Sequence, residues 1–384
     1  MKRRDFVSAV AAAGGLGLAG CLTNEGTGTE GGTDTTGGTA TTTSQGTGKA
    51  TTTGEPSGKL TVATYESFVD SPSSSPGAWI KQEFEKQYDD VTIEWKTPKN
   101  GVTEYVQRRS EGVSVDADVF VGLNVDDLVT IDDTLGDKRL FGELSRSDIA
   151  RASRVRSELE FDDPKGRVLP YDTGYISLVY DEGAVDAPQT FEDLTTDPYQ
   201  GTLLAQNAQS ADSGQAFMLW TVDAIGEDGY LDYWQDLQAN DVKILGSWWN
   251  AYKAYLDGQR PIVVSYSTDQ VYANRDDLDM SRHQVGFLND QGYANPEGMA
   301  VFQNTDKPRL ATEFLNFMLA SETQATLAVR NVQFPAVTDD HVSLPASFDD
   351  YAFRPPETVA YTYQELQGNL STWTEEWAKT IASN

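Results

Sequence analysis

Residues 168–180 read Val-Leu-Pro-Tyr-Asp-Thr-Gly-Tyr-Ile-Ser-Leu-Val-Tyr, and this stretch decides the fold that the sequence predicts. β-Branched and aromatic residues are frequent in it, which is typical of a strand, and it is roughly twice as long as a strand of about 5–6 residues. Pro170 lacks a backbone N–H and therefore interrupts the strand near its beginning. The pattern is typical of a strand that starts in one sheet and ends in another, so we expect two α/β lobes connected by crossing strands.

Strand and helix patterns alternate on the N-terminal side of this segment. Ile80, Phe84 and Tyr88 recur every four residues and would face the core from one side of a helix. A second helix is expected near Thr103 to Glu111. The succession of strand, helix, strand, helix and strand predicts a parallel sheet covered by helices on both faces. The three strands are expected at residues 60–65, 91–95 and 117–123.

A second alternating region follows on the C-terminal side. We expect helices at 215–224, 230–237 and 248–256, and strands at 261–266 and 299–302. The chain then reads as helical, and residues 321–324 have the pattern of a capping box that opens a helix. Two apolar helix faces are expected to pack on the body, one with Leu310, Phe314, Phe317 and Met318, and the last with Trp373, Trp377 and Ile381.

This organisation predicts an α/β protein with a ligand cleft between its two lobes. We expect one lobe to contain residues 58–170 and 286–384 and the other to contain 171–285, with hinges near 170–173 and 286–290. In open α/β sheets, ligands bind beyond the carboxyl ends of the strands. Those ends contain Tyr65, Asn124, Asp172 and the run Tyr266-Ser-Thr-Asp269, a set that is aromatic and polar without a catalytic arrangement.

The 384-residue chain is strongly acidic, because 59 Asp and Glu against 29 Lys and Arg give a formal charge of −30. Nucleic acids and anionic lipids would be repelled by such a chain, so neither is an expected partner. The acidity favours a halophile-type surface, and an ordinary acidic secreted protein is the alternative. The hydrophobic fraction of 39% is nevertheless sufficient for most of the chain to fold.

The first 21 residues resemble a lipoprotein export signal. Arg3 and Arg4, followed by Phe6, match a twin-arginine signal, and the apolar stretch that follows is shorter than the roughly 20 residues needed to span a membrane. Leu18-Ala19-Gly20-Cys21 resembles a lipobox, in which the cysteine is lipidated and becomes the mature N-terminus. We therefore predict a signal peptide at residues 1–20 and a lipidated Cys21.

Residues 21–57 are expected to be a disordered tether. Of the 36 positions from 22 to 57, 14 are Thr and 9 are Gly, so this segment has almost no apolar side chains with which to form a core. A lipidated residue followed by a flexible spacer predicts a protein anchored to the outer face of the cell membrane.

The sequence lacks the residue patterns of common enzymes. It has two histidines, His283 and His341, and no Walker loop, dinucleotide fingerprint or Gly-x-Ser-x-Gly motif. Neighbouring acids such as Asp126 and Asp127 are so abundant that we interpret them as solvated surface pairs. We therefore expect no catalytic residues, no cofactor and no metal site.

Five segments together resemble the thiamine-binding branch of the solute-binding proteins of ABC importers. They occur in the order of that family and extend the resemblance over essentially the whole body, from about Lys59 to Trp377. The resemblance implies a periplasmic-binding-protein-like fold and an ABC permease and ATPase as partners. The segments are 60–68, 117–124, 169–181, 246–252 and 264–269.

The resemblance also implies a set of ligand-binding residues. Thiamine contains a cationic thiazolium and a flat aminopyrimidine, and aromatic faces attract such cations. The residues implied to form the site are Tyr65, Asn100, Gly101, Asn124, Asp212, Ser213, Trp248, Tyr266, Ser267, Thr268, Asp269 and Tyr272. Of these, Asp212 and Ser213 precede a helix and would hold a phosphate or hydroxyethyl group, and Asp269 would balance the cation.

Two positions depart from the family pattern. The family has a Trp after the first strand, where this chain has residues 71–76, and another Trp where it reads Val332-Gln-Phe334. Phe334 is a candidate to compensate, and thiamine phosphate or a related cation is an alternative ligand. A carrier of iron or another small molecule with the same fold, and an extracellular hydrolase, are the alternative functions.

Overall fold

The computed structural model describes residues 56–71 and 75–382. The predicted signal peptide, Cys21 and nearly all of the predicted tether lie outside the described residues. The helices and strands belong to the unit Gly54–Asn384, and no helix in this described part of the chain is both long and apolar enough to cross a membrane.

The described strands form one mixed sheet with the order β2-β1-β3-β9-β4-β7-β5-β6. Three short strands pair at its centre: β8 (Gln284–Gly286) and β10 (Phe334–Pro335) with β4, and β11 (Glu357–Val359) with β9. The bounds of the others are β1 Gly58–Ala63, β2 Val91–Lys96, β3 Val119–Leu123, β4 Val168–Tyr180, β5 Leu203–Gln206, β6 Lys243–Leu245, β7 Ile262–Tyr266 and β9 Gln291–Val301.

The first half of the sheet has the predicted parallel arrangement. β1 pairs in parallel with both β2 and β3, and the fully buried Leu60, Val62 and Phe84 form a core with Phe314. The apolar spacing that predicted the helices containing Phe84 and Phe314 therefore marks the buried faces of those helices. The helices of this half are α1 Glu66–Val69, α2 Gly77–Glu85, α3 Thr103–Ser110, α4 Val125–Leu135, α9 Pro308–Met318 and α10 Ser321–Arg330.

Two long antiparallel strands, β4 and β9, connect the halves of the sheet. β4 pairs with β9 from Val168 to Ile176, with a register shift between Pro170 and Asp172, and its second part also pairs with β7. The predicted long strand and its interruption are confirmed. The expectation that it starts in one sheet and ends in another is wrong, because β9 runs beside it and makes the sheet continuous.

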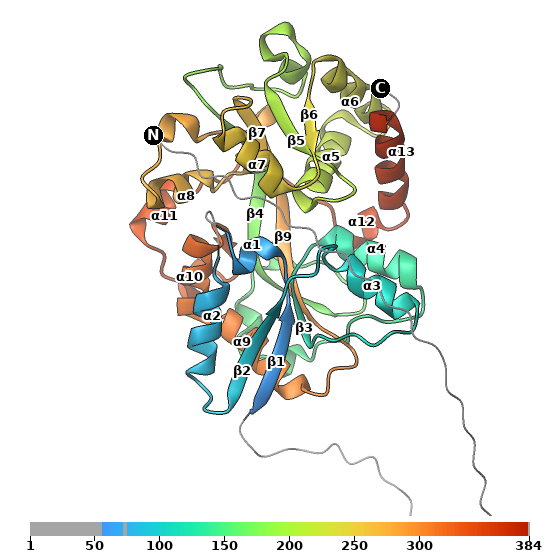
Figure 1. Cartoon of the computed structure of the whole chain (residues 1–384), viewed down its shortest axis with the longest axis vertical. Helices are drawn as coiled ribbons and strands as arrows, with labels where there is room; N and C mark the ends of the chain where they lie inside the picture. Colours follow the sequence, from blue (N-terminus) through green and yellow to red (C-terminus); the bar gives the residue numbers. More distant parts are fainter. Residues whose placement is uncertain (1–55, 72–74, 383–384) are drawn as a thin grey trace, which may run out of the picture. The chain divides into compact units, whose positions relative to one another are not determined.

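The second half of the sheet contains β5, β6 and β7, which lie at the opposite end of β4 and β9 from β1, β2 and β3 (Figure 1). β5 pairs in parallel with both β6 and β7. The α/β fold class is therefore confirmed. The helices of this half are α5 Asp212–Ile225, α6 Tyr230–Ala239, α7 Trp248–Leu256 and α8 Asp269–Arg275.

The C-terminal part of the chain ties the two halves together. α13 (Leu370–Ala382) places Trp377 against Trp234 of α6, with ring centroids 5.3 Å apart, which confirms the predicted last helix. The capping box predicted at 321–324 is wrong, since Ala320 is the N-cap of α10 and no side chain caps it. Gln324 instead donates to the carbonyl of Tyr171. The remaining helices are α11 Ala346–Tyr351 and α12 Tyr363–Leu366.

Candidate ligand-binding site

Two buried carboxylates and two tyrosines meet where β4, β9 and the end of β1 lie together. The Tyr65 hydroxyl donates to Glu297 Oε2 at 2.9 Å, and the Tyr171 hydroxyl donates to the same oxygen. Asn331 Nδ2 donates to Asp172 Oδ2 at 2.8 Å and also contacts the Tyr65 hydroxyl at 3.0 Å. Residues from four distant segments therefore form one polar cluster.

The two carboxyls of this cluster resist ionisation. Burial, and then the Glu297 carboxylate, raise the pKa of Asp172 well above its usual range. Burial also raises the pKa of Glu297 to about 7, although hydrogen bonds from Tyr171 and Tyr65 act in the opposite direction. Desolvation and a like charge both disfavour the ionised forms, so a cation placed between these carboxyls would be attracted strongly.

A second group of acids begins the helices α4 and α5. Burial, and then the Asp212 carboxylate, raise the pKa of Asp126 to about 7, and the same causes raise the pKa of Asp127 well above its usual range. The interpretation of Asp126 and Asp127 as a solvated surface pair is therefore wrong. Asp127 also accepts from the backbone N–H of Asn124, and together they form the capping box of α4.

Asp212 is an exposed residue in the first turn of α5. Burial by the surrounding protein nevertheless raises the pKa of its carboxyl. Its charge also contributes to raising the pKa of Glu297. Asp212 therefore connects the acids at the helix ends with the carboxylates on the central strands.

Asn295 links two of the predicted site residues. The side-chain amide of Asn124 donates to Asn295 Oδ1 at 3.1 Å and to the carbonyl of Pro296 at 3.0 Å. Asn295 Nδ2 in turn donates to the hydroxyl of Tyr266 at 3.4 Å. Tyr65, Asn124 and Tyr266, which the sequence placed at strand ends, thus border the same cluster of side chains on β9.

Trp248 extends the aromatic surface next to Tyr266. The centroids of the two rings are 6.5 Å apart, and Trp248 stacks on Tyr252 at 4.9 Å with an interplanar angle of 13°. Trp248 Nε1 donates to Ser265 Oγ at 3.1 Å. The indole is thus held on one face and at its edge while remaining partly exposed.

Two glycines make room for the tyrosine rings. A Cβ at Gly122, whose φ is +92°, would lie 2.5 Å from the ring of Tyr65. A Cβ at Gly174 would lie 2.4 Å from the ring of Tyr266 and 2.3 Å from Gln333 Oε1. Non-bonded atoms in a packed interior do not approach this closely, so only glycine at these two positions leaves room for the tyrosine rings.

Several buried polar atoms around the rings have no hydrogen-bond partner within the described residues. They include Asp172 Oδ1, Gln333 Oε1 and Ser267 Oγ, and Asp172 and Gln333 are 0% and 6% exposed. A buried acceptor without a donor is costly, and such groups are found where a ligand or water supplies the donor.

Comparison with known proteins now identifies the family. The family described as bacterial extracellular solute-binding protein matches residues 79–353. The chain belongs to this family. This membership confirms the family that the sequence predicted. It also confirms the prediction that the protein is a carrier and not an enzyme.

Relatives of this solute-binding protein include proteins named for thiamine. The thiamine-binding periplasmic protein of Escherichia coli is 27% identical over 330 residues, covering 84% of this chain and 93% of the relative. The protein with the same name from Brucella melitensis is 30% identical over 321 residues, covering 83% of this chain and 91% of the relative.

Solved structures agree with the two-lobed fold class. A periplasmic thiamin binding protein aligns with a TM-score of 0.73 at 26% identity, covering 85% of this chain and 96% of the other. A ferric binding protein from Campylobacter jejuni aligns with a TM-score of 0.66, covering 84% and 99% of the two chains. Its 16% identity shows a common fold alone. In the described part of this chain, no group of three or more His, Cys, Asp or Glu side chains could hold a metal ion.

Three of the predicted site residues of this solute-binding protein lie behind the aromatic surface. The Asp269 carboxylate contacts His283 Nδ1 at 2.6 Å and accepts from the Tyr252 hydroxyl, so both of its oxygens are occupied. The rings of Tyr272 and His283 are 6.2 Å apart. Thr268 Oγ1 donates to a backbone carbonyl at 2.6 Å. Asp269 and Tyr272 thus both contact Tyr252, the ring on which Trp248 stacks.

The other predicted residues are not joined to the cluster by side-chain contacts. Asn100 is exposed, and Gly101, with a φ of +53°, lies in the adjacent turn. Ser213 is buried, and its hydroxyl donates to Gln206 Oε1 at 3.1 Å. Phe334, considered as a replacement for a missing Trp, packs against Tyr175 and is buried in a hydrophobic core.

Several residues of the cluster were missed in the sequence: Glu297, Asn295, Asn331 and Gln333. Glu297 and Asn295 belong to the part of β9 that has little strand propensity, and a recognised strand there would have drawn attention to them. Asn331 and Gln333 follow α10 and flank Val332, which has a φ of +58°. Nothing in the local sequence marks the latter two as site residues.

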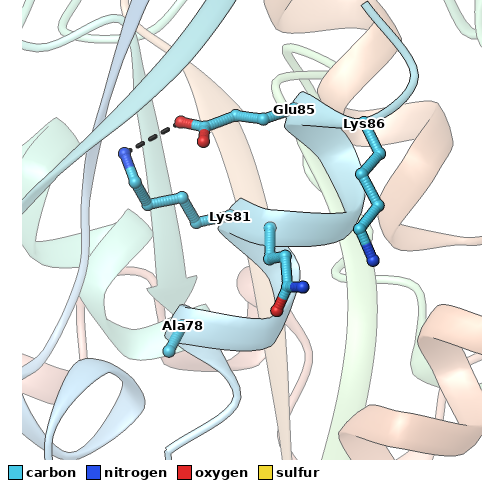
Figure 2. A pocket seen from close by; sticks show the side chains of 5 residues that line it. Ala78, Lys81, Glu85 and Lys86 are labelled. Atoms are coloured by element: carbon cyan, nitrogen blue, oxygen red, sulfur yellow. Dashed lines mark ion pairs between the residues drawn. The ribbon is translucent and has the colours of Figure 1, made fainter.

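The hollow shown in Figure 2 is a surface feature of α2, separate from this cluster. It has a volume of about 440 Å³, and its lining comes from one helix, including Lys81 and Glu85. These two side chains form an ion pair of 2.8 Å, and both also bond to the backbone of Ile93. Their role is to fix α2 on β2, and none of the predicted ligand residues lines the hollow.

Proposed function

We propose that this protein binds thiamine and carries it to an ABC importer. The observation that carries the proposal is the arrangement of Tyr65, Trp248 and Tyr266 around the buried carboxyls Asp172 and Glu297. Aromatic faces and carboxylates are the two kinds of group that hold an aromatic cation in a protein interior.

The chemistry of thiamine matches both kinds of group. Its thiazolium is a permanent cation, so it would offset the charge of Asp172 and Glu297 and favour their ionised forms. Each aromatic ring that stacks on the cation contributes on the order of 0.5–2 kcal/mol. The amino group of the pyrimidine donates hydrogen bonds, and Asp172 Oδ1 and Gln333 Oε1 are buried acceptors without partners.

The relatives support the same ligand. Proteins named thiamine-binding periplasmic protein align over more than four-fifths of this chain at 27% and 30% identity. The aligned region contains both halves of the sheet. The residues around the proposed site also come from both halves. From the predicted set we keep Tyr65, Asn124, Trp248, Tyr266 and Ser267 as ligand contacts, and we propose Asp172 and Glu297 in place of Asp269 as the groups that balance the cation.

The cellular role follows from the predicted export signal. We propose that the protein acts outside the cytoplasm, anchored to the outer face of the cell membrane through a lipidated Cys21, and that it delivers its ligand to a permease driven by an ATPase. Closure about the predicted hinges near 170–173 and 286–290 would bury the ligand. The charge of −30 agrees with a body that stays soluble in concentrated salt.

Isothermal titration calorimetry of the full chain with thiamine tests the ligand. We expect saturable heat, and a rise in the unfolding temperature with ligand concentration. Trp248→Ala should weaken binding at least tenfold, because it removes the aromatic face beside Tyr266. Trp79→Ala is the matched control, since Trp79 stacks on Phe317 and is not one of the proposed ligand contacts. No heat and no thermal shift at millimolar thiamine would contradict the proposal.

A further inference from the structure

Two buried oxygens of the cluster accept no hydrogen bond from any described residue. They are Asp172 Oδ1 and Gln333 Oε1, and their residues are 0% and 6% exposed. The other carboxylate oxygen of Asp172 accepts from Asn331 Nδ2 at 2.8 Å, which fixes the orientation of the carboxylate. A buried acceptor without a donor is costly, so these two oxygens indicate a ligand that supplies donors to them.

Strand register places both acceptors along one face of the central sheet. Asp172 and Gly174 are two residues apart on β4, so their Cα–Cβ directions point to the same face. β10 pairs antiparallel with β4 and sets Phe334 opposite Thr173. The same register brings Gln333 opposite Gly174, which has no side chain of its own. The two acceptors therefore follow one another on the same face of β4.

The amide of Gln333 lies in the space that the absent side chain at position 174 leaves. A Cβ at Gly174 would be 2.3 Å from Gln333 Oε1 and 2.4 Å from the ring of Tyr266, so this oxygen and the ring lie next to each other. Tyr266 belongs to the same face, because it pairs with Ile176 two residues further along β4. The acceptors thus border an aromatic ring on which a flat ligand ring would stack.

An amino group on a flat ring matches two acceptors in this arrangement. Its two N–H bonds diverge by about 120°, so acceptors about 2.9 Å from its nitrogen lie roughly 5 Å apart. Positions two apart on a strand are about 6.6 Å apart, a spacing from which two side chains can converge on one amino group. The Asp172 carboxylate only accepts when it is ionised, and a bound cation favours that form. A carbonyl in place of the amino group would set an acceptor against acceptors.

We infer that Asp172 and Gln333 determine specificity, by accepting the two N–H bonds of the ligand's ring amino group and rejecting analogues that have a carbonyl there. The inference rests on the proposed function, in which the aminopyrimidine of thiamine supplies this amino group. A site whose buried polar groups an analogue leaves unpaired rejects that analogue strongly. Both acceptors are covered by the protein in this structure, so the ligand would reach them before closure about the hinges predicted near 170–173 and 286–290.

Calorimetry of the full chain with two probes tests the inference. Thiamine and oxythiamine, in which a carbonyl oxygen replaces the amino group, are titrated at pH 7.5. Both probes contain the thiazolium cation, so the difference between their affinities reports on the amino position. We expect oxythiamine to bind at least 100-fold more weakly than thiamine. Affinities within about threefold would overturn the inference and leave the proposed function intact, whereas failure of both probes to bind would overturn the proposed function itself.

Asp172→Asn should change the preference of the site and not only its affinity. Because Asn331 Nδ2 donates to one oxygen of residue 172, the new amide should keep its oxygen there and place its NH₂ group where Oδ1 was. A donor then replaces an acceptor and suits the carbonyl of oxythiamine. The lost charge weakens both cations alike, so the measurement is the ratio of thiamine affinity to oxythiamine affinity. We expect this ratio to fall at least 20-fold.

Gln333→Leu removes the second acceptor at similar volume and should lower the same ratio at least tenfold. A purely structural role of Gln333 would weaken both probes equally and leave the ratio unchanged. Gln367→Leu is the matched control, because Gln367 is exposed at the end of α12, and it should leave both affinities unchanged. Thermal unfolding confirms that each variant is folded, and if one variant fails to fold, the wild-type comparison and the other variant decide. An unchanged ratio in the folded site variants would overturn the inference.

Discussion

Replacing Glu297 by Gln should stabilise the unliganded protein and weaken its binding of thiamine. Glu297 is 8% exposed and accepts hydrogen bonds from the Tyr65 and Tyr171 hydroxyls. The amide oxygen of a Gln at this position can accept the same bonds. The substitution therefore removes a buried negative charge while it keeps the packing and the hydrogen bonds.

The size of the stabilisation follows from the pKa of Glu297, which burial raises from 4.5 to about 7. Between these pH values the native state holds a proton that the unfolded chain has released. Native stability consequently falls as pH rises through this window, by ~1.4 kcal/mol for each pH unit. The wild type should lose up to about 3 kcal/mol of unfolding free energy by pH 8 through this group, and Glu297→Gln should not.

Urea unfolding followed by tryptophan fluorescence measures this difference. The advantage of Glu297→Gln over the wild type should be near zero below pH 4.5 and should grow until pH 8. Glu94→Gln is the control, since the Glu94 side chain is 44% exposed and pairs with Lys59 on the surface, where an ion pair contributes little to stability. Calorimetry at pH 8 should show thiamine affinity at least tenfold lower for Glu297→Gln.

The reasoning would be refuted by a variant whose unfolding free energy parallels that of the wild type from pH 4.5 to 8. Such a result would mean that Glu297 is hydrated in the unliganded protein. A variant that is more stable but binds thiamine as tightly as the wild type would show instead that Glu297 is a buried acid without a part in binding.

Two further substitutions probe the packing of the site and of the scaffold. Gly174→Ala should lower thiamine affinity at least tenfold by calorimetry, because the new Cβ would lie 2.4 Å from the Tyr266 ring; Gly142→Ala, whose Cβ would have no neighbour closer than 3.8 Å, should bind normally. Arg167→Ala should reduce the unfolding free energy by about 3–5 kcal/mol in urea, because it removes a buried guanidinium that pairs with both Asp163 and Asp132 and leaves Asp132 with Lys165. Lys253→Ala, which breaks an exposed pair, should cost less than ~1 kcal/mol.

Regular periodicity explains which elements were predictable. The strand at 91–95 and the helix containing Ile80 and Phe84 repeat apolar residues at the spacing that burial requires, and both are observed. β9 was expected only near Met299, because Gly292, Asn295 and Pro296 interrupt any strand pattern before it. Its pairing with β4, which no local signal reports, holds this stretch extended.

The residues of the candidate site also fall into some that the sequence predicts and some that it does not. Tyr65, Asn124 and Tyr266 could be predicted because they follow or end apolar strands, and parallel topology brings such ends together. Asp126, Asp127 and Glu297 could not, because with 59 Asp and Glu in the chain these carboxylates do not stand out. What distinguishes Asp126 from a surface acid is its enclosure and the approach of Asp212, and both depend on contacts between segments far apart in sequence.

We propose that the placement of these acids connects ligand charge with closure of the protein about the hinges predicted near 170–173 and 286–290. Asp126 and Asp127 begin α4 beside one half of the sheet, while Asp212 begins α5 beside the other, and the charge of Asp212 raises the pKa of both. Bringing the halves together would therefore bring like charges closer to one another, which would oppose closure in the absence of a cation. A bound cation would offset that repulsion only in the closed arrangement. It would therefore interact more favourably with the closed arrangement than with the open one, and so favour closure. Because Asp126 is buried, its charge is screened weakly, so this coupling should persist in concentrated salt better than the field of the exposed surface acids, which is lost within a few ångströms.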